Sequence, residues 1–322
     1  MAKADKSASA GQKLQKVLAG LGLGSRREME RWIEQGRLSI DGREAQLGDR
    51  VGEDQRIELD GRPLGRQVSE GTRCLLYNKP TGEVSSRKDP EGRRTVFERL
   101  PKVRDGRWIS IGRLDYNTSG LLLFTTDGEL ANALMHPSSI IDREYLVRVK
   151  GEVDEAHLQA MLDGVLLEDG VARFTDIQPG RGDEESGNRW FYVVLMEGRN
   201  REVRRLWESQ GLKVSRLKRV RYGEVFLPSS LKKGQYTELE RKDVETLYRM
   251  AGLPMKAVLA PTPDDRRRSK RRAGKRAEGT GDRGKGRKPG ARGKERKASA
   301  KGAGKSAGKS AGKSDKRRQG RG

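Results

Sequence analysis

Residues 112–128 read GRLDYNTSGLLLFTTDG, a polar loop with a single acid, Asp115, followed by a strongly apolar run. The apolar residues 121–124 between polar neighbours are typical of a buried strand. Asp127 precedes a helical pattern at 129–135, so it is predicted to accept hydrogen bonds from the free N–H groups of that helix. An acid among Gly, Asn and Ser residues is usually a turn residue. These residues alone therefore leave Asp115 only a candidate for chemistry.

Further strands and helices are predicted on both sides of this stretch, between residues 74 and 251. The strand candidates are 74–78, 108–111, 121–125, 145–150, 191–196 and 214–219, and the helix candidates are 129–135, 154–162, 201–210 and 243–250. Strands and helices do not alternate strictly along the chain, which favours a mixed or antiparallel sheet in an α+β fold over a Rossmann sheet. Residues 191–196 are apolar on both faces, which is typical of a central strand.

A smaller unit is predicted in front of these elements. Apolar residues recur at helical spacing from Leu14 to Leu21, and glycines at 20, 22 and 24 end that helix. Ser25 and Glu28 have the spacing of a capping box for a second helix, which is predicted to end at Gly36. The polar side of this second helix carries Arg26, Arg27 and Arg31. Short strands with a turn signal follow, so about 60 residues form a minidomain.

Most of the excess positive charge lies at the C-terminal end of the chain. The 322 residues carry 69 Lys and Arg against 46 Asp and Glu, a net charge of +23, and residues 266–322 alone carry 24 against 4. Residues 1–265 are nearly neutral, with 45 against 42. Residues 266–322 contain no Leu, Ile, Val, Met, Phe, Tyr or Trp, so a disordered tail is expected there. Such a cationic tail implies a polyanionic partner, either nucleic acid or an anionic membrane surface.

The composition argues against several classes of protein. One cysteine, Cys74, excludes an intramolecular disulfide and a thiolate metal cluster, and two histidines, His136 and His157, argue against a protein-built zinc site. No apolar run approaches the roughly 18–20 residues of a membrane span, and the N-terminus lacks the apolar core of a signal peptide. We therefore expect a cytoplasmic protein with a metal-free mechanism.

Several segments together resemble one family, the pseudouridine synthases, in the branch with an S4 RNA-binding domain at the front. Residues 112–120 resemble the catalytic motif of that family. The other segments are KLQKVL at 13–18, GSRRE at 24–28, GRLSIDG at 36–42, NKPTG at 78–82, DPEG at 89–92 and EGRNREVRRL at 197–206. The resemblance extends in order from residue 11 to residue 250. It implies an α+β fold with a mixed, mainly antiparallel central sheet, divided into an S4 domain at 11–70, a catalytic domain at 71–255 and a disordered basic tail at 256–322.

The resemblance also implies roles for individual residues. Asp115 corresponds to the acid that such enzymes require, and Tyr145 to the aromatic residue that stacks on the target uracil. Arg204 corresponds to the basic residue that pairs with the acid, and Arg113 to a residue associated with helix entry and base flipping. Asp115 could attack C1′, stabilise positive charge there, or take a proton from C2′, and the sequence does not choose among these routes.

The resemblance implies an rRNA substrate, no cofactor and no membrane partner. The expected partner is 23S rRNA or a large-subunit assembly intermediate, bound by a monomeric enzyme, with 16S rRNA as the nearest alternative. Arg26, Arg27 and Arg31 are expected to contact phosphates. A non-catalytic RNA-binding or ribosome-assembly factor is a second interpretation, but it predicts a damaged acid motif. A DNA-compacting protein is a third, and it leaves about 240 nearly neutral residues unexplained.

Two of these residues also have ordinary structural explanations. Tyr145 alternates with Val147 and Val149, as a core tyrosine on a strand would. Arg204 shares its predicted helix with Arg201 and Arg205, which is the pattern of a solvated or phosphate-facing basic side. Both explanations stay open at the level of the sequence.

Overall fold

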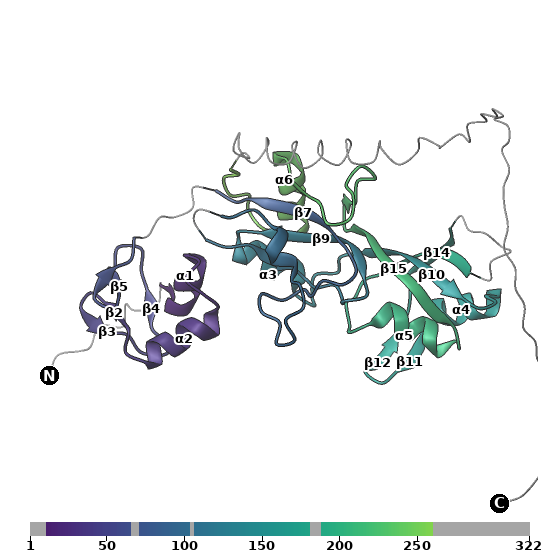
Figure 1. Ribbon diagram of the computed structural model, residues 1–322, viewed down its shortest axis with the longest axis horizontal. Helices are drawn as coiled ribbons and strands as arrows, with labels where there is room; N and C mark the ends of the chain where they lie inside the picture. The colour runs from purple at the N-terminus through teal and green to yellow at the C-terminus, as the bar shows by residue number, and fades with distance from the viewer. Residues whose placement is uncertain (1–10, 66–70, 104–105, 181–187, 260–322) are drawn as a thin grey trace, which may run out of the picture. The chain divides into compact units, whose positions relative to one another are not determined.

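The computed structural model describes residues 11–65, 71–103, 106–180 and 188–259 (Figure 1). The tail expected to be disordered lies, from residue 260 onward, outside the described residues. Among the residues that are described, no helix is long and apolar enough to cross a membrane.

The N-terminal domain packs two short helices against small antiparallel strands. Its elements are β1 (Gln12–Lys13), α1 (Leu14–Gly20), α2 (Arg26–Glu34), β2 (Leu38–Ile40), β3 (Arg43–Glu44), β4 (Arg50–Val51), β5 (Ile57–Leu59) and β6 (Arg62–Pro63). β1 pairs with β4, and the other four strands are ordered β3-β2-β5-β6. Leu14, Leu18, Met29 and Ile33 from the two helices are buried in one core with apolar residues of the strands.

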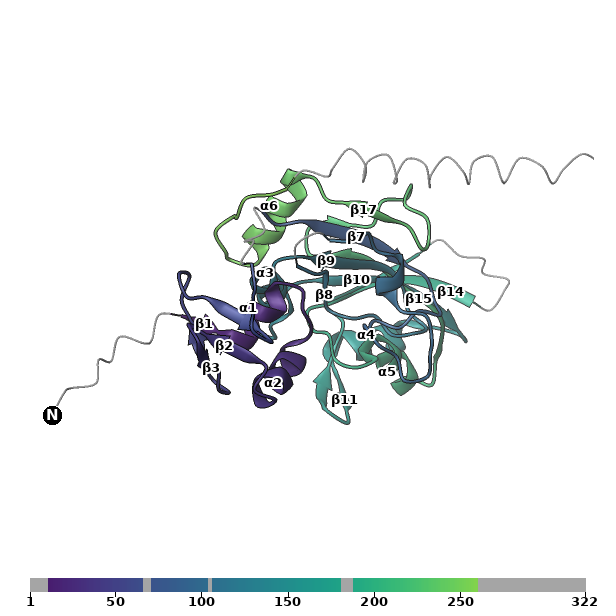
Figure 2. The same cartoon turned by 60° about the vertical axis from the view of Figure 1, so that its left-hand side comes forward.

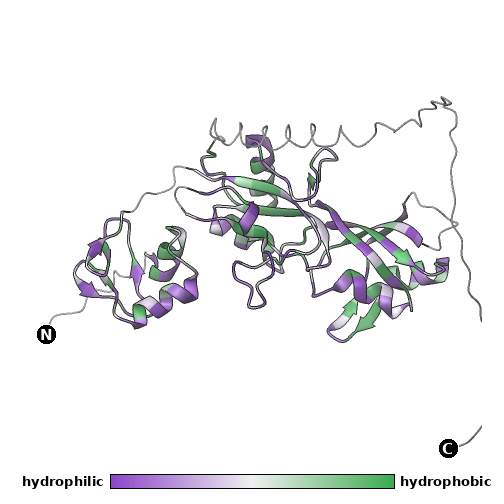
Figure 3. Ribbon diagram, viewed as in Figure 1, coloured by the Kyte–Doolittle hydropathy of each residue, from purple (hydrophilic) through white to green (hydrophobic). Residues whose placement is uncertain are grey.

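The start of α2 confirms the predicted capping box. The Ser25 hydroxyl accepts the Glu28 N–H at 3.1 Å, and the Glu28 carboxylate accepts the Ser25 N–H at 3.3 Å. Two backbone N–H groups at the helix start are thereby satisfied. Because Met29 and Ile33 face the core, the polar side of α2 is left to solvent, and Figure 3 shows this helix as largely hydrophilic.

The second domain is built on a nine-stranded sheet. Its strands are β7 (Cys74–Lys79), β8 (Ile109–Ile111), β9 (Ser119–Thr125), β10 (Arg143–Lys150), β13 (Asp176–Pro179), β14 (Asn188–Leu195), β15 (Lys213–Tyr222), β16 (Val225–Phe226) and β17 (Tyr236–Glu238). Their order is β13-β14-β10-β15-β9-β7-β17, with β8 beside β9 and β16 beside β15. Among the described strands of this sheet, β9 and β15 are the one parallel pair. The sheet is therefore mixed and mainly antiparallel, as predicted.

Helices and a hairpin cover this sheet. They are the 3-10 helix η1 (Val96–Arg99), α3 (Gly128–Met135), α4 (Glu155–Asp163), α5 (Glu202–Ser209), α6 (Arg241–Met250) and the hairpin of β11 (Val165–Leu167) and β12 (Gly170–Ala172). Leu75 and Tyr77 on β7 join one core, while Cys74 and Leu76 join a second core on the opposite face. Figures 1 and 2 show α3 and α6 near β7 and β9, and α4 and α5 near β10 and β14.

The parallel contact between β9 and β15 is short and depends on a glycine. Two residue pairs join these strands, Ser119 with Lys218 and Gly120 with Arg219. Gly120 has a φ of 106°, and a Cβ there would lie 2.1 Å from the Arg219 carbonyl oxygen. A side chain at this position would push the two strands apart. This close contact lies immediately after the loop that contains Asp115.

Two predictions about this domain need correction. The expectation of a central strand at 191–196 is wrong in part, because β14 lies next to the edge strand β13 and Tyr192 is 39% exposed. The domain end predicted at residue 255 falls too early. The Lys256 ammonium lies 3.0 Å from the Asp127 carboxylate, and Val258 forms a β-bridge with Thr72, so the chain contacts this domain through residue 259.

Candidate active site

Asp115 lies in the loop between β8 and β9, and every backbone carbonyl from residue 114 to residue 118 accepts a hydrogen bond. The Ser85 hydroxyl donates to the Leu114 carbonyl at 2.8 Å. The Gly82 N–H donates to the Tyr116 carbonyl at 3.0 Å. The segment that follows β7 therefore packs against the Asp115 loop and fixes two of its carbonyl groups.

Lys79, at the end of β7, holds the middle of the loop. Its ammonium donates to the carbonyls of Asp115 at 3.0 Å, Thr118 at 2.9 Å and Pro80 at 3.1 Å, and its side chain is fully buried. Three carbonyl acceptors match the three N–H groups of a charged ammonium. Burial lowers the pKa of Lys79 to about 8, while the carboxylates of Glu83 and Asp115 act in the opposite direction. The sequence interpretation assigns Lys79 no role, although a lysine ending an otherwise apolar strand is a visible signal.

Arg204, on α5, also donates a hydrogen bond to the backbone of this loop. It is 7% exposed, and its terminal nitrogens donate to the carbonyls of Asn117 at 3.2 Å and Val214 at 3.0 Å. Burial, and to a smaller extent Arg201, lower the pKa of Arg204, while the Asp115 carboxylate acts in the opposite direction. This burial rules out the alternative explanation that Arg204 belongs to a solvated basic side of the helix. Among the described residues, Arg204 and Asp115 form no direct ion pair, and the two terminal nitrogens of Arg204 donate to carbonyl groups instead.

Asp115 lines a cavity of about 750 Å³, within the range of roughly 300–1,000 Å³ that is usual for small-molecule sites. Its carboxylate has no hydrogen bond or ion pair with any residue that the structure describes. The cavity wall also carries several arginines, namely Arg113, Arg143, Arg199, Arg201 and Arg219. One unpaired carboxylate among several guanidinium groups suits a substrate that is itself anionic, such as a phosphate-linked chain.

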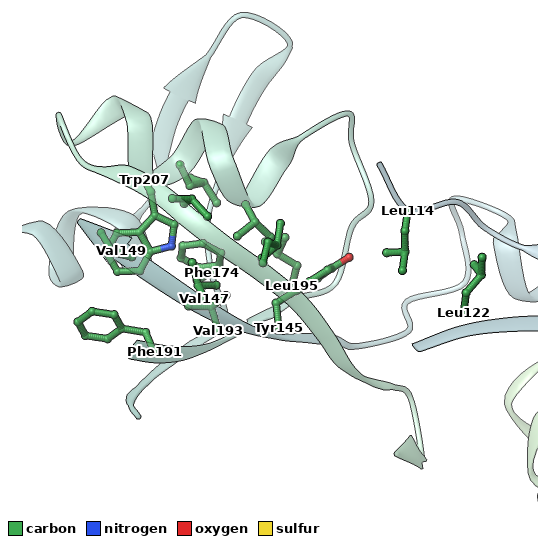
Figure 4. Packing of buried hydrophobic residues seen from close by; sticks show 14 of the residues in the cluster. Leu114, Leu122, Tyr145, Val147, Val149, Phe174, Phe191, Val193, Leu195 and Trp207 are labelled. Carbon is green, nitrogen blue, oxygen red and sulfur yellow. The ribbon is translucent and has the colours of Figure 1, made fainter. Parts of the chain in front are cut away.

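The ring of Tyr145 forms part of the same wall. Tyr145 lies on β10 opposite Arg219 of β15 and is 9% exposed. Figure 4 shows its ring extending away from Trp207 and toward Leu114, the residue before Asp115. Its hydroxyl has no hydrogen-bond partner among the described residues. A tyrosine that only fills a core usually bonds its hydroxyl, so the core explanation accounts for the packing of Tyr145 but not for its free hydroxyl.

The remaining arginines singled out from the sequence are exposed. Arg113 lines the cavity, and Arg26, Arg27 and Arg31 lie on the polar side of α2. Within the described parts of the chain, none of these four guanidinium groups has a hydrogen bond or an ion pair. Exposed guanidinium groups of this kind are available to phosphate oxygens.

The two histidines and the cysteine have structural surroundings. His136 ends α3 and hydrogen-bonds the Ser138 hydroxyl at 2.7 Å, and His157 lies 2.8 Å from the Asp154 carboxylate at the start of α4. Cys74 is buried, and burial raises its pKa to about 12. Among the described residues, no three His, Cys, Asp or Glu side chains gather where they could hold a metal ion.

Two protein-family models match this chain. Residues 73–209 match the model described as RNA pseudouridylate synthase, and residues 12–57 match the S4 domain. The first match contains the Asp115 loop, Tyr145 and Arg204, and the second contains α1 and α2.

Individual relatives are similar over most of the chain. A Pseudomonas aeruginosa protein named ribosomal large subunit pseudouridine synthase B is 55% identical over 269 residues, which cover 83% of this chain and 69% of the relative. A Vibrio cholerae protein of the same name is 56% identical over 266 residues, 81% of this chain and 82% of the relative. A solved structure described as a pseudouridylate synthase is 27% identical with a TM-score of 0.52, covering 73% of this chain and 99% of that one.

Proposed function

The chain belongs to the RNA pseudouridylate synthase family, and we propose that it isomerises uridine to pseudouridine in the RNA of the large ribosomal subunit. The observation that carries this proposal is the Asp115 loop, in which five consecutive carbonyls are bonded while the carboxylate, beside a cavity, has no partner among the described residues. The names of two relatives more than half identical to this chain favour the large subunit. The proposed partner is therefore 23S rRNA or a large-subunit assembly intermediate, ahead of 16S rRNA.

In this reaction Asp115 supplies negative charge at C1′ of the target uridine. The bond between C1′ and N1 breaks, the uracil turns while bound, and a bond between C1′ and C5 forms. One hydrogen leaves C5 and one is gained at N1, so the product is an isomer and no co-reactant is needed. Attack on C1′, stabilisation of positive charge there, and removal of a proton from C2′ all require an ionised and fixed carboxylate.

The other residues of the site hold the base or the acid. Tyr145 stacks on the uracil after the nucleotide leaves its helix, as an aromatic wall allows. Arg113, exposed and lining the cavity, contacts the RNA where the base leaves it. Arg204 and Lys79 act through the backbone of the Asp115 loop and are positioning residues, which also put positive charge near the carboxylate.

The remaining parts of the chain serve RNA binding in this proposal. An S4 domain at 11–70 docks the enzyme, with Arg26, Arg27 and Arg31 on phosphates. A catalytic domain from residue 71 to residue 259 carries the chemistry. The basic residues of 266–322 add electrostatic attraction without sequence preference. We propose a monomeric enzyme that works in the cytoplasm without a cofactor.

A chemical map of pseudouridines in ribosomal RNA tests the proposal. RNA from a strain that lacks this gene should miss one or a few pseudouridines in the large-subunit RNA. Supplying the wild-type chain should restore them, and supplying Asp115→Asn at equal abundance should not. A complete map in the deletion strain, or a loss confined to small-subunit RNA, would contradict the proposed substrate. Restoration by the Asn variant would contradict the role of Asp115.

A further inference from the structure

Arg219 is a buried charge whose hydrogen bonds the fold leaves incomplete. It is 3% exposed, yet it lines the cavity beside Asp115. Its Nε donates to the Leu121 carbonyl at 2.8 Å. Its Nη2 is buried and has no hydrogen-bond partner among the described residues. Buried polar groups are nearly always paired, and a charged group is the most costly to leave unpaired, so this one in a cavity wall points to a missing partner.

Two features hold the Arg219 guanidinium beside the proposed stacking ring. The strands β10 and β15 pair Tyr145 with Arg219 and Arg143 with Tyr222, and the register shifts between Glu144 and Tyr145. Paired residues project from the same face of a sheet, and a bulge changes where a side chain points. The guanidinium carbons of Arg219 and Arg143 each lie 5.3 Å from the centre of the Tyr222 ring. Arg219 is therefore fixed next to Tyr145 by its Nε contact and by its stacking on Tyr222.

Two other residues of the cavity wall also have a buried polar atom that finds no partner in the part of the chain that the structure describes. They are Thr118, through Oγ1, and Glu202, through Oε1. The other carboxylate oxygen of Glu202 accepts the Arg199 N–H at 3.0 Å, which explains this residue as a link at the start of α5. A hydroxyl or a carboxyl group carries no positive charge to balance negative charge on a ligand, whereas a guanidinium does. Among these three residues, only Arg219 carries such a charge.

We propose that the Arg219 guanidinium donates a hydrogen bond to a carbonyl oxygen of the uracil while the base is detached from the ribose. This inference rests on the proposed function. When the bond between C1′ and N1 breaks, its electron pair stays on the uracil, where the negative charge is shared by N1, O2 and O4. A fixed guanidinium beside the stacking ring stabilises that charge and retains the base while it turns. After the bond between C1′ and C5 forms, C5 loses a proton and N1 gains one. Arg219 keeps all its protons throughout.

Sulfur substitution in the substrate tests this contact. An rRNA fragment containing the target uridine is made with uridine, 2-thiouridine or 4-thiouridine at that site, because sulfur accepts hydrogen bonds more weakly than oxygen. Wild type, Arg219→Met, Arg219→Lys and the control Arg216→Met are compared at saturating enzyme in a single turnover. Arg216 is an exposed residue of the same strand, so the control makes the same change of charge outside the cavity. Product is measured by digestion and mass spectrometry.

The ratio of the oxygen rate to the sulfur rate separates a contact with uracil from a structural role. At one of the two thio positions, this ratio should fall by roughly 10- to 100-fold from wild type to Arg219→Met, and it should not change in Arg216→Met. A residue that only supported Leu121 and Tyr222 would slow all substrates equally and leave both ratios unchanged, which would overturn the proposal. If Arg219→Met does not fold, Arg219→Lys gives the same comparison with the charge retained. Failure of wild type to convert the uridine substrate would instead contradict the proposed function.

Discussion

The Asp115 loop and helix α2 use positive charge in opposite ways. Beside the loop, Lys79 and Arg204 are 0% and 7% exposed and donate to backbone carbonyls far away in the sequence. On α2, Arg26, Arg27 and Arg31 are exposed and have no ion pair among the described residues. Buried cations are tolerated only where their hydrogen bonds are satisfied, so those beside the loop fix geometry. Exposed cations cost little and remain available to an anionic partner.

The two kinds of cation should therefore fail in different ways. Substitutions of the cations beside the loop should lower the rate of conversion at saturating enzyme, and a change in salt concentration should not restore that rate. Changes on α2 or in the basic tail should lower affinity, and the loss should shrink as salt rises.

Asp115→Asn should abolish pseudouridine formation. The change keeps size and shape but removes the charge on which every proposed route depends, so the single-turnover rate should fall by at least about 1,000-fold. Melting temperature and RNA affinity should stay near those of wild type, because the carboxylate has no partner among the described residues. Asp163→Asn, the same change at an exposed position of α4, is the matched control. Conversion by the Asn variant at a comparable rate would remove Asp115 from the chemistry.

Lys79→Met should lower the saturated rate by roughly 100-fold, because a shift of the acid by about 1 Å is enough for such a loss. Methionine fills the space but donates no hydrogen bond to the carbonyls of Asp115 and Thr118. RNA affinity should be unchanged, since Lys79 is fully buried. A variant with the wild-type rate would mean that the loop holds its shape without this lysine.

The wild-type rate should also fall as pH rises through about 8, the pKa to which burial lowers Lys79. A neutral amine has only two N–H groups for three carbonyls. Stability should change in the opposite direction. The pKa is lowered from an ordinary value of 10.5, so between pH 8 and 10.5 the unfolded chain binds more protons and this group's contribution to stability rises with pH. Rates and melting temperatures measured from pH 6.5 to 9.5 separate the two effects. The same decline in Lys79→Met would place the titrating group elsewhere.

Local patterns predicted the elements that depend on neighbouring residues. The capping roles of Ser25 and Asp127 are confirmed, since each acts within three residues of itself. The place of a strand within the sheet depends on distant segments, and there the sequence misled. β14 is apolar at residues 191–196, but its edge-side neighbour β13 has the largely polar sequence DIQP, which gives no strand signal. The last strand, β17, has only three residues, and the sequence pattern does not predict it.

The candidate site was predictable only where a resemblance named its residues. Asp115 and Tyr145 were singled out on that basis, and the structure brings both to one cavity. The position of Lys79 is a signal in the sequence, but the contacts of Lys79 with Asp115 and of Arg219 with Leu121 are not, because these carbonyls lie 36 and 98 residues away along the chain. A direct pair between Arg204 and Asp115 could not be judged from spacing, because the Arg204 side chain donates instead to the carbonyls of Val214 on β15 and Asn117 in the loop.

Tyr145 should matter less than Asp115, because stacking on a base is worth only about 1–3 kcal/mol. Tyr145→Phe keeps the ring and should retain RNA conversion, whereas Tyr145→Ala should lower it by roughly 5- to 150-fold. The Tyr145 hydroxyl has no partner among the described residues, so its loss should leave stability unchanged. Single-turnover rates and melting temperatures of both variants provide the measurement. A Phe variant as slow as the Ala variant would show that the hydroxyl, and not the ring, carries the function.

The triple replacement of Arg26, Arg27 and Arg31 by Ala should reduce affinity and leave the saturated rate unchanged. If each contacts one phosphate, the slope of log affinity against log salt should become shallower by about 2.7 on duplex or 2.1 on single-stranded RNA. The matched control is Arg37→Ala, because Arg37 is already committed to an ion pair with Asp60 at 2.5 Å and should change the slope little. Unfolding of the triple variant would mean that these arginines are structural.

Deletion of residues 266–322 should have no effect on conversion at saturating enzyme. This segment carries 24 Lys and Arg against 4 Asp and Glu, and a charge of that size contributes affinity for any RNA. The truncated chain should bind an rRNA fragment more weakly at low salt, with a shallower salt slope, and approach the full chain as salt rises. It should modify the same uridine, because the cavity proposed to hold the base is formed by residues 84–222. Titrations of both chains from about 50 to 400 mM salt, with a chemical map of the product, test both expectations. A new target site, or a lower rate at saturation, would mean that the tail acts on the site as the buried cations do, and the contrast between the two kinds of charge would fail there.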